Sequence, residues 1–236
     1  MTLDRVTWKR PAAEFLAIFA GVTLSFAADD WRDRLADREA EQAGLELILD
    51  DLRADTVEIL SAISFVSRHD EAALAFLSFG DEPPSADSIG TTLKRFIFGD
   101  AYQFQRAGFL SLREADRLSL IRDVTLRSDI IRYFEEEQVK LVRYLEEEQA
   151  KRDDILEALV DHVRWPGPRS METTWPLAPG PVSIRTSWAE IRGDAELEFR
   201  AMFVGAYASL SVRLATEVLE SNTQLRGAIE RQLENG

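Results

Sequence analysis

An apolar run near the amino terminus, at residues 12–28 (AAEFLAIFAGVTLSFAA), is the first strong pattern of the chain. It contains a single charged residue, Glu14. As a helix the run rises roughly 26 Å, close to the minimum length that crosses the hydrocarbon core of a bilayer. The pattern predicts a transmembrane helix at 12–28, preceded by a basic leader at 1–11 and followed by a helical bundle domain at 29–236.

Two other interpretations of this run stay open. A helix buried in a protein core can be equally apolar, and Glu14, Thr23 and Ser25 would then need polar partners inside the protein. A secretory signal is the second alternative, because Ser25-Phe26-Ala27 satisfies the small-residue rule for cleavage after Ala27. Since Glu14 interrupts the apolar region of such a signal, we favour the membrane anchor.

The charges on the two sides of the run have opposite signs. Residues 1–11 carry three basic residues and one acid, whereas residues 29–58 carry 11 acids and four arginines. Basic residues beside an anchor stay in the cytoplasm, and tryptophans such as Trp8 and Trp31 favour the headgroup zone at its two ends. We therefore expect a cytoplasmic amino terminus and an extracytoplasmic domain, which in a bacterium means the inner membrane and the periplasm.

One face of the predicted anchor is small or polar. Its residues recur at spacings of three and four: Glu14, Ala17, Gly21, Ser25 and Ala28. Small residues let membrane helices approach closely, and a carboxyl group near the apolar region seeks a protein or water neighbour. The face predicts pairing of the anchor with another helix, or a ring of anchors. The alternative is that this composition is ordinary for a membrane helix and that the carboxyl group lies at the headgroups.

Beyond the run, helical spacing of apolar residues continues without a proline as far as Pro83. The positions concerned are Trp31, Leu35, Leu45, Ile48, Leu52, Leu60, Ile63 and Val66. The pattern predicts that the anchor continues into a long helix that ends near Ser78 or Gly80. Acidic residues at intervals of four between 29 and 41 indicate a solvated face, with a divalent cation site at 29–33 as the alternative.

Short helices are predicted after this long helix. Asp87 or Ser88 is expected to cap one that ends at Phe98. Residues 101–121 predict two more, one of which begins at a capping box formed by Ser111 and Glu114.

Two further long helices complete an all-α prediction. Asp123 caps one that runs to about Val163, and the capping box of Ser187 and Glu190 opens the last one, at 188–233. The expected core stripe of the last helix is Met202, Phe203, Tyr207, Leu210, Leu214, Val218, Leu225 and Ile229. The expected fold is an amino-terminal transmembrane helix continuous with a long helix, followed by an antiparallel helical bundle.

One internal repeat lies in the helix that follows Asp123. Residues 132–140 (RYFEEEQVK) and 143–151 (RYLEEEQAK) are offset by eleven positions, which is nearly three helical turns. Tyr133 and Tyr144 therefore fall on one side of the helix and the two glutamate triplets on another. We interpret the repeat as a straight helix with a solvated acidic face, and a cation-binding surface is the alternative.

Residues 165–187 interrupt every periodicity. The stretch holds five of the eight prolines and two of the five tryptophans, Trp165 and Trp175. Long loops of this kind are often functional. These two tryptophans, together with Trp31, are candidates for contact with a partner or a membrane, although packing of the loop on its own domain is the simpler interpretation.

Composition excludes several classes of function. The net charge of −14 and pI near 4.7 argue against binding of nucleic acid, and zero cysteines exclude disulfides and thiolate metal sites. His69 and His162, the two histidines, are too far apart in sequence for a helical zinc motif. The chain has no phosphate-binding glycine loop and no nucleophile elbow. We therefore predict no catalytic residue, no cofactor and no metal, and we do not expect an enzyme.

Two stretches carry a family resemblance. They are residues 14–31 (EFLAIFAGVTLSFAADDW), with the charged and leucine-rich residues up to 55, and residues 109–123 (FLSLREADRLSLIRD). Both resemble an uncharacterised bacterial family of small membrane-anchored helical proteins, a domain of unknown function. The family usually has glycine where this chain has Asp116, and aspartate tolerates the left-handed conformation, so a tight turn is expected there. The resemblance implies the anchor and the helical fold, and no activity.

The leading hypothesis is a noncatalytic, membrane-anchored interaction or scaffold protein, which forms a homo-oligomer or is an accessory subunit of a larger membrane complex. Its expected partners are membrane lipid and other membrane subunits. One alternative is an extracytoplasmic ligand-sensing bundle with the loop after Trp165 as its lid. Another is a homo-oligomeric channel lined by Glu14, Ser25 and Asp29.

Overall fold

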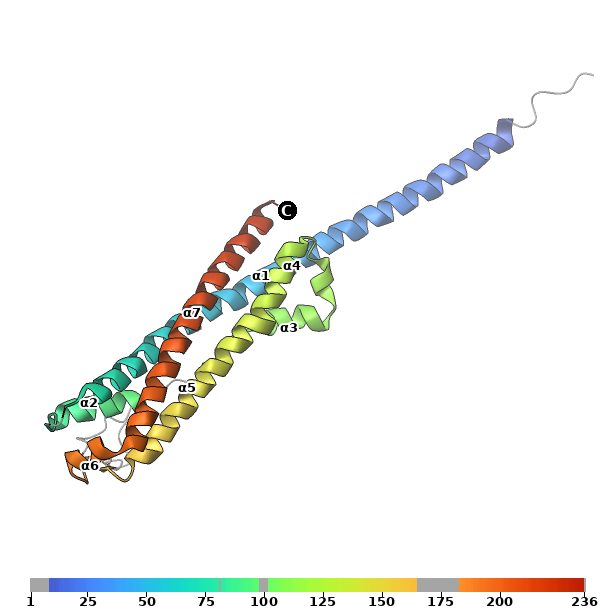
Figure 1. Ribbon diagram of the computed structural model, residues 1–236. Coiled ribbons are helices and arrows are strands. Elements are labelled where there is room, and N and C mark those ends of the chain that lie inside the picture. Colours follow the sequence, from blue (N-terminus) through green and yellow to red (C-terminus); the bar gives the residue numbers. More distant parts are fainter. Residues whose placement is uncertain (1–8, 81, 98–101, 165–182, 236) are drawn as a thin grey trace, which may run out of the picture.

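The computed structural model describes residues 9–80, 82–97, 102–164 and 183–235, and the side chains in these ranges except those of 9–14, 17, 86, 87, 94, 97, 164 and 183. Three long helices dominate this part of the chain (Figure 1): α1 (Lys9–Ser78), α5 (Gln138–Leu159) and α7 (Ala195–Asn235). The described strands are β1 (Val163–Arg164) and β2 (Ser183–Ile184), which form one antiparallel pair. The all-α prediction is confirmed.

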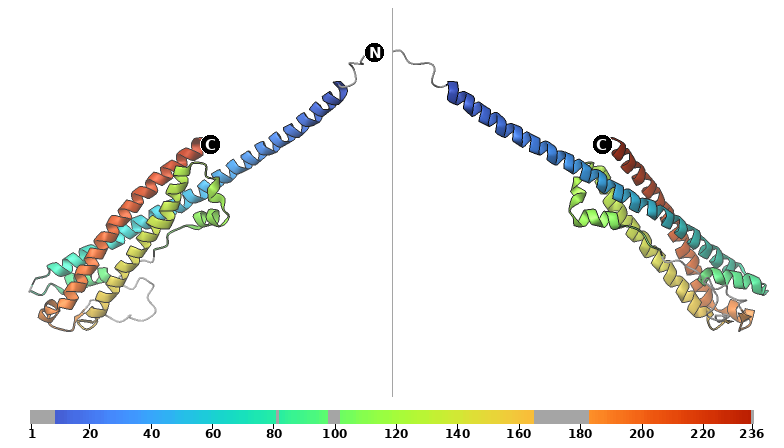
Figure 2. Two further views of the ribbon diagram at one scale, coloured as in Figure 1. Left: turned by 45° about the vertical axis from the view of Figure 1, so that its right-hand side comes forward. Right: turned by 180° about the vertical axis from the view of Figure 1, so that it is seen from behind.

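The long helices form an antiparallel bundle, as predicted. Helices α1 and α5 run in the same direction, and α7 returns along both of them (Figures 1 and 2). The chain travels back from the end of α1 through short elements, which are α2 (Ala86–Ile97), an extended stretch at 102–106, α3 (Ala107–Glu114) and the 3-10 turn η1 (Arg117–Leu120). It then enters α4 (Val124–Arg132), which the π-helical turn η2 (Tyr133–Glu137) joins to α5.

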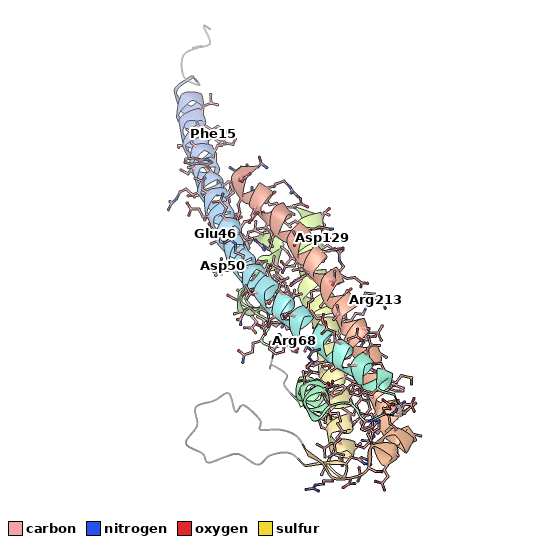
Figure 3. The ribbon with its side chains drawn as sticks, turned by 90° about the vertical axis from the view of Figure 1, so that its left-hand side faces the viewer. Phe15, Glu46, Asp50, Arg68, Asp129 and Arg213 are labelled. Atoms are coloured by element: carbon pink, nitrogen blue, oxygen red, sulfur yellow. The ribbon has the colours of Figure 1, made fainter. Side chains whose placement is uncertain are left out.

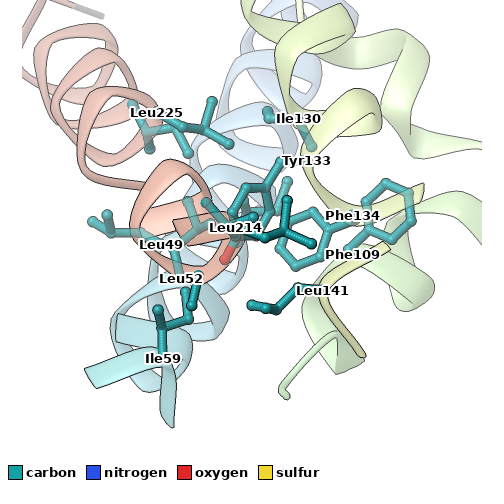
Figure 4. Close-up of a cluster of buried hydrophobic side chains, with 14 of the residues drawn as sticks. Leu49, Leu52, Ile59, Phe109, Ile130, Tyr133, Phe134, Leu141, Leu214 and Leu225 are labelled. Carbon is teal, nitrogen blue, oxygen red and sulfur yellow. The ribbon is translucent and has the colours of Figure 1, made fainter. Parts of the chain in front are cut away.

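The core consists of two clusters of buried side chains. The first lies where α1, α3, η2 and α7 meet, and Figure 4 shows Tyr133 and Phe134 in it beside Phe109 and Leu52. The rings of Phe109 and Phe134 stack with centroids 4.8 Å apart. The second cluster fills the other end of the bundle, around Phe96 and helix α6 (Trp188–Gly193). Burial of these large side chains is the main source of stability in such a fold.

Helix α1 extends far beyond the bundle at its amino-terminal end (Figures 1 and 3). Described side chains before residue 40 are all exposed, and Glu41 is the first buried one. The prediction of one long helix ending near Ser78 is confirmed. The predicted stripe is wrong at Trp31 and Leu35, which are exposed because none of the described helices covers them, and at Leu60, whose neighbour Ile59 occupies the core instead.

Two predicted helix starts are wrong. Helix α2 begins after Ser85, whose hydroxyl accepts a hydrogen bond from the backbone N–H of Ser88, so neither Asp87 nor Ser88 is its cap. Ser111 lies inside α3 and does not begin it. Two other caps are confirmed, since the Asp123 carboxylate caps α4 and the capping box at Ser187 opens α6.

Both predicted long helices of the second half are interrupted. The first contains the π-helical turn η2 and ends at Leu159, because Val163 pairs in β1. The second breaks at Asp194, whose Oδ1 accepts hydrogen bonds from the backbone N–H groups of the residues two and three positions later and so caps α7. At Asp116 the expected tight turn is present, with a left-handed φ of 55°.

The predicted core stripe of α7 is wrong in its first half. The buried positions there are small or aliphatic: Leu197, Ala201, Val204, Ala208 and Ser211. Met202 and Leu210 are exposed instead. A Cβ at Gly205 would lie 3.2 Å from Cβ of Ala73, so α7 approaches α1 closely here and only small side chains fit between them.

Gly108 marks an even closer approach, of α3 to α1. A Cβ at this position would lie 2.7 Å from the carbonyl oxygen of Leu47 and 2.9 Å from Oδ2 of Asp51. We expect Gly108→Ala to lower the free energy of unfolding by about 2 kcal/mol, because α3 must move away from α1. Gly193→Ala is the matched control, since nothing lies within 4 Å of its Cβ position. Circular dichroism measures the urea unfolding of both variants. Equal unfolding midpoints for Gly108→Ala and Gly193→Ala would refute this account.

Candidate functional site

A row of acidic side chains on α1 binds the main chain of the returning segment. Each carboxylate accepts a hydrogen bond from one backbone N–H group. Glu41 accepts from Arg122 (2.9 Å), Asp51 from Phe109 (3.0 Å), Asp55 from Gln105 (2.7 Å) and Glu58 from Gln103 (2.8 Å). An extended segment and the start of a helix leave N–H groups without local partners. The row therefore replaces the local cap that α3 lacks and fixes this segment along α1.

Asp55 is the centre of this arrangement and is completely buried. Its Oδ2 accepts hydrogen bonds from the Tyr133 hydroxyl at 3.0 Å and from Nε2 of Gln138 at 2.7 Å, while its Oδ1 accepts the bond from Gln105. The same Gln138 amide donates to the carbonyl oxygen of Gln105 at 3.2 Å. Three donors from three segments thus converge on one carboxylate.

Helix α7 joins the network through Asn222, which is also completely buried. Its Nδ2 donates to the Tyr133 hydroxyl at 2.9 Å and to the carbonyl oxygen of Leu52 at 3.0 Å, and its Oδ1 accepts from the Thr56 hydroxyl at 2.9 Å. Arg226 donates to Thr56 at 3.1 Å from the surface side. A polar chain therefore crosses the core from the extended stretch 102–106 through Asp55 of α1 and Tyr133 of η2 to Asn222 of α7.

The π-helical turn η2 places Tyr133 in this chain. Such turns insert one residue into a helix and occur frequently at functional sites. Here the inserted turn directs both Tyr133 and Phe134 into the core, where their rings lie 5.0 Å apart. The Phe134 carbonyl oxygen accepts a long hydrogen bond, 3.4 Å, from the guanidinium of Arg106.

Burial shifts the ionisation of this network. It raises the pKa of Asp55 from its usual value to about 6, against the lowering effect of hydrogen bonds from Gln105, Tyr133 and Gln138. Burial also raises the pKa of Asp51, against the hydrogen bonds from the backbone of Phe109 and its neighbour. The pKa of Tyr133 is raised by burial and by the nearby Asp55 charge. With a pKa of about 6, Asp55 changes its charge in a mildly acidic range.

This shift predicts a pH dependence of stability. Between about pH 4 and pH 6 the folded protein binds more protons at Asp55 than the unfolded chain, so the free energy of unfolding falls by about 3 kcal/mol as pH rises through this window. Asp51 acts in the same direction. The pKa values of Asp194 and Glu190 are lowered, so these two groups raise the free energy of unfolding as pH rises, in a more acidic range. Urea titrations between pH 4 and pH 7 measure the slope.

Asp55→Asn should reduce this slope, because it removes the titrating group. Asp50→Asn is the matched control, since Asp50 is five residues earlier on α1 and its side chain is largely exposed (Figure 3). An unchanged slope in Asp55→Asn would contradict the assignment of the pH dependence to this carboxylate.

A groove of about 610 Å³ opens over the network, between residues 102–106 and α5. Gln105 and Gln138, which donate hydrogen bonds to the buried Asp55 beneath the groove, contribute to the floor of the groove. The remaining lining is mixed and comprises Tyr102, Gln103, Phe104, Arg106, Val139, Val142, Arg143 and Glu146. Its size is typical of sites for small molecules.

A second buried polar cluster lies farther along α5. Glu148, completely buried, accepts from Nε of Arg152 at 3.0 Å and lies 2.9 Å from Nδ1 of His69 on α1. Arg152 also donates to the carbonyl oxygen of Phe96 at 3.3 Å. The interpretation of the second glutamate triplet as fully solvated is therefore wrong at Glu148, because the helix turns this position toward α1.

His162 belongs to a third polar contact at the far end of the bundle. Its Nε2 lies 3.1 Å from Oδ2 of Asp194 and its Nδ1 lies 3.0 Å from the hydroxyl of Thr186. The contact ties the β1–β2 pair to the start of α7. Among the described residues, no group of three or more histidine, aspartate or glutamate side chains is placed to hold a metal ion.

The residues predicted for membrane packing lie on the projecting part of α1, apart from the polar network. Within the described side chains, Ser25 donates to the carbonyl oxygen of Gly21 at 3.0 Å, and nothing lies within 4 Å of the Cβ position of Gly21. Ala28 and Trp31 are exposed. The side chains of Glu14 and Ala17, and all of Trp165 and Trp175, lie outside the described residues.

Within the described residues, α7 is the helix that is long and apolar enough to cross a membrane, judged by length and composition alone. In its most apolar 18-residue segment, 33% is buried inside the protein. Its buried side chains face α1 and α5, as in the core helix of a bundle. The assignment of 12–28 as a membrane helix stays a prediction.

The comparisons with known proteins give no match: no family model, no characterised protein and no solved structure is similar to this chain. The family resemblance at 14–31 and 109–123 therefore stays a prediction as well.

Proposed function

We propose that this protein is a noncatalytic, single-pass membrane-anchored interaction protein. The observation that carries the proposal is the projecting part of α1, which is continuous with the bundle (Figure 1) and presents large, exposed apolar side chains. They are 49–71% exposed: Phe15, Leu16, Ile18, Phe19, Val22, Leu24 and Phe26. Transfer of each such side chain out of water is favourable by a free energy of about 1.5–3 kcal/mol. A lipid bilayer would remove all of these side chains from water at once.

Charge defines the direction of insertion in this proposal. The basic leader favours the cytoplasm, and the acidic bundle then lies outside, in the periplasm if the membrane is a bacterial inner membrane. Residues 29–40 form a helical stalk of roughly 18 Å between the membrane and the first buried residue, Glu41. The carboxyl terminus of α7 lies at the membrane-proximal end of the bundle, and α2 and α6 lie at the distal end (Figure 2).

The small face of the anchor is the proposed contact with other membrane helices. It leads either to a homo-oligomer or to attachment as an accessory subunit of a larger complex. Support comes from the helical register, since Gly21 and Ser25 lie one turn apart and no described residue lies within 4 Å of the Cβ position of Gly21. Close backbone approach at such positions stabilises helix pairs in lipid.

The test is the mass of the full-length protein in mild detergent, with its co-purifying proteins identified. We expect a defined homo-oligomer or heteromer, and we expect Gly21→Ile to weaken it by about 1–2 kcal/mol, or roughly tenfold, because the new side chain separates the helices. Val22→Ile introduces the same residue on the adjacent bulky face and is the control.

The oligomer distribution distinguishes the outcomes. A loss of association in Gly21→Ile but not in Val22→Ile supports the proposal. A monomer without partners, or an oligomer that neither variant changes, would exclude association through this face of the anchor.

A further inference from the structure

The groove beside α5 combines apolar walls with two arginines that form no ion pair with any described residue. Tyr102 and Phe104 are half-buried against the core and form one wall, while Val139 and Val142 form the other. Aromatic and aliphatic walls of this kind bury the apolar body of a small molecule. The volume of about 610 Å³ suits one such molecule and is too small for a folded partner.

Arg106 is the strongest indication of what binds there. Its Nε is buried without a hydrogen-bond partner among the described residues, and its one described hydrogen bond is the long contact with the carbonyl oxygen of Phe134. A guanidinium carries five donors, and buried donors in native proteins are nearly always satisfied. Nε itself is closed off from the groove, but Arg106 is one of the lining residues, so its terminal N–H groups can bind a ligand that supplies acceptor oxygens.

A second guanidinium faces the same groove from the other side. Arg143 of α5 is exposed, and its described contact is a distant one, 5.7 Å from its Cζ to the ring centroid of Tyr144. Glu146 is the acid among the lining residues, so the lining carries two cations and one anion. Asp55 lies behind Gln105 and Gln138, and a ligand in the groove does not contact it because it is completely buried.

The frame of the groove is already fixed. Glu58 and Asp55 bind the backbone N–H groups of Gln103 and Gln105, and Gln138 binds Asp55 from α5. Both walls are therefore tied to the same carboxylate on α1. A site that is ordered before binding loses little conformational entropy when the ligand enters.

We propose that this groove binds a small organic carboxylate with an apolar body. The carboxylate lies between Arg106 and Arg143, where planar guanidinium groups match its geometry, and the apolar body lies against Tyr102, Phe104 and the two valines. The site goes beyond the proposed membrane function and does not depend on it, because every lining residue belongs to the bundle.

The test uses the full chain in lipid nanodiscs and isothermal titration with 3-phenylpropanoate. We expect saturable binding, and we expect the neutral amide, 3-phenylpropanamide, to bind at least about tenfold more weakly because it lacks the charge-assisted hydrogen bonds. Arg143→Gln should cause a similar loss. Because Arg143 is exposed, its replacement leaves the core intact.

Arg213→Gln is the control, since Arg213 is exposed on α7 and is not among the lining residues (Figure 3). Absence of heat with millimolar 3-phenylpropanoate, equal binding of the acid and the amide, or equal binding by Arg143→Gln and the unchanged protein would each overturn the proposal. None of these results bears on the anchor, which the membrane experiments test separately.

Discussion

Replacing Ile18 and Leu24 together by arginine should release the protein from membranes into the soluble fraction. Both side chains are about two-thirds exposed on the projecting part of α1 and lie in the middle of the apolar run. An arginine near the centre of a membrane helix costs about 2.5–3.5 kcal/mol, so the pair should lower the partition into lipid by about four to five orders of magnitude. Fractionation of cells followed by alkaline extraction of the membranes measures the change.

The matched control places the same two charges elsewhere on α1. Val57 and Leu60 are also exposed apolar residues of this helix, but they lie within the bundle segment. The variant with arginine at both positions should remain in the membrane fraction. If the two double variants fractionate alike, the apolar run is not what attaches the protein to a membrane.

Asp55→Ala should lower the stability of the bundle by about 3 kcal/mol at pH 7. The change leaves the donors of Gln105, Tyr133 and Gln138 unsatisfied in a completely buried position and adds a small cavity. Relief of the buried charge offsets part of this cost, because the raised pKa of Asp55 shows that burial disfavours its ionised form. Urea unfolding of the purified full-length protein gives the difference.

Two further variants separate the network from general effects of substitution. Asp50→Ala removes a largely exposed carboxylate that binds Arg53 and should change stability by less than about 0.5 kcal/mol. Tyr133→Phe removes one donor to Asp55 and the acceptor of one Asn222 hydrogen bond but leaves Asp55 with two donors, so about 2 kcal/mol is expected. A loss in Asp55→Ala no larger than that in Asp50→Ala would show that the carboxylate does not organise the segment.

The helices were predictable where local chemistry decides them. The caps at Asp123 and Ser187 lie next to the backbone N–H groups that they bind, and the long helix from the apolar run to Ser78 contains no residue that would break it. The caps and the long helix can be predicted from a few neighbouring positions. The left-handed turn at Asp116 was expected on another ground, the family resemblance, in which glycine usually occupies this position.

Features that depend on distant contacts were not predictable from the same pattern. Helix α3 begins at Ala107 because Asp51 of α1 binds its first turn, and no local cap indicates that start. The first half of α7 buries its small residues, since its backbone comes close to Ala73, so the larger Met202 faces solvent. Tertiary packing overrides hydrophobic periodicity in both cases.

The sequence does contain an indication of the polar network, although hydrophobic periodicity alone does not reveal it. Asn222 occupies a position in the apolar stripe of α7 between Val218 and Leu225, and Asp51 and Asp55 lie one turn apart among the buried leucines of α1. A polar residue at a core position needs a buried partner. The partner Tyr133 could not be identified, because the π-helical turn that directs it inward has no local signature.

The most direct test of the membrane anchor is labelling of single cysteines with a membrane-impermeant maleimide in intact spheroplasts. The chain contains no cysteine, so Leu24→Cys and Val57→Cys each provide one reactive site. We predict that Val57→Cys is labelled from outside and that Leu24→Cys reacts only after detergent dissolves the membrane. Labelling of Leu24→Cys in intact spheroplasts at the rate of Val57→Cys would contradict the membrane anchor, and protection of both positions would contradict the extracytoplasmic orientation.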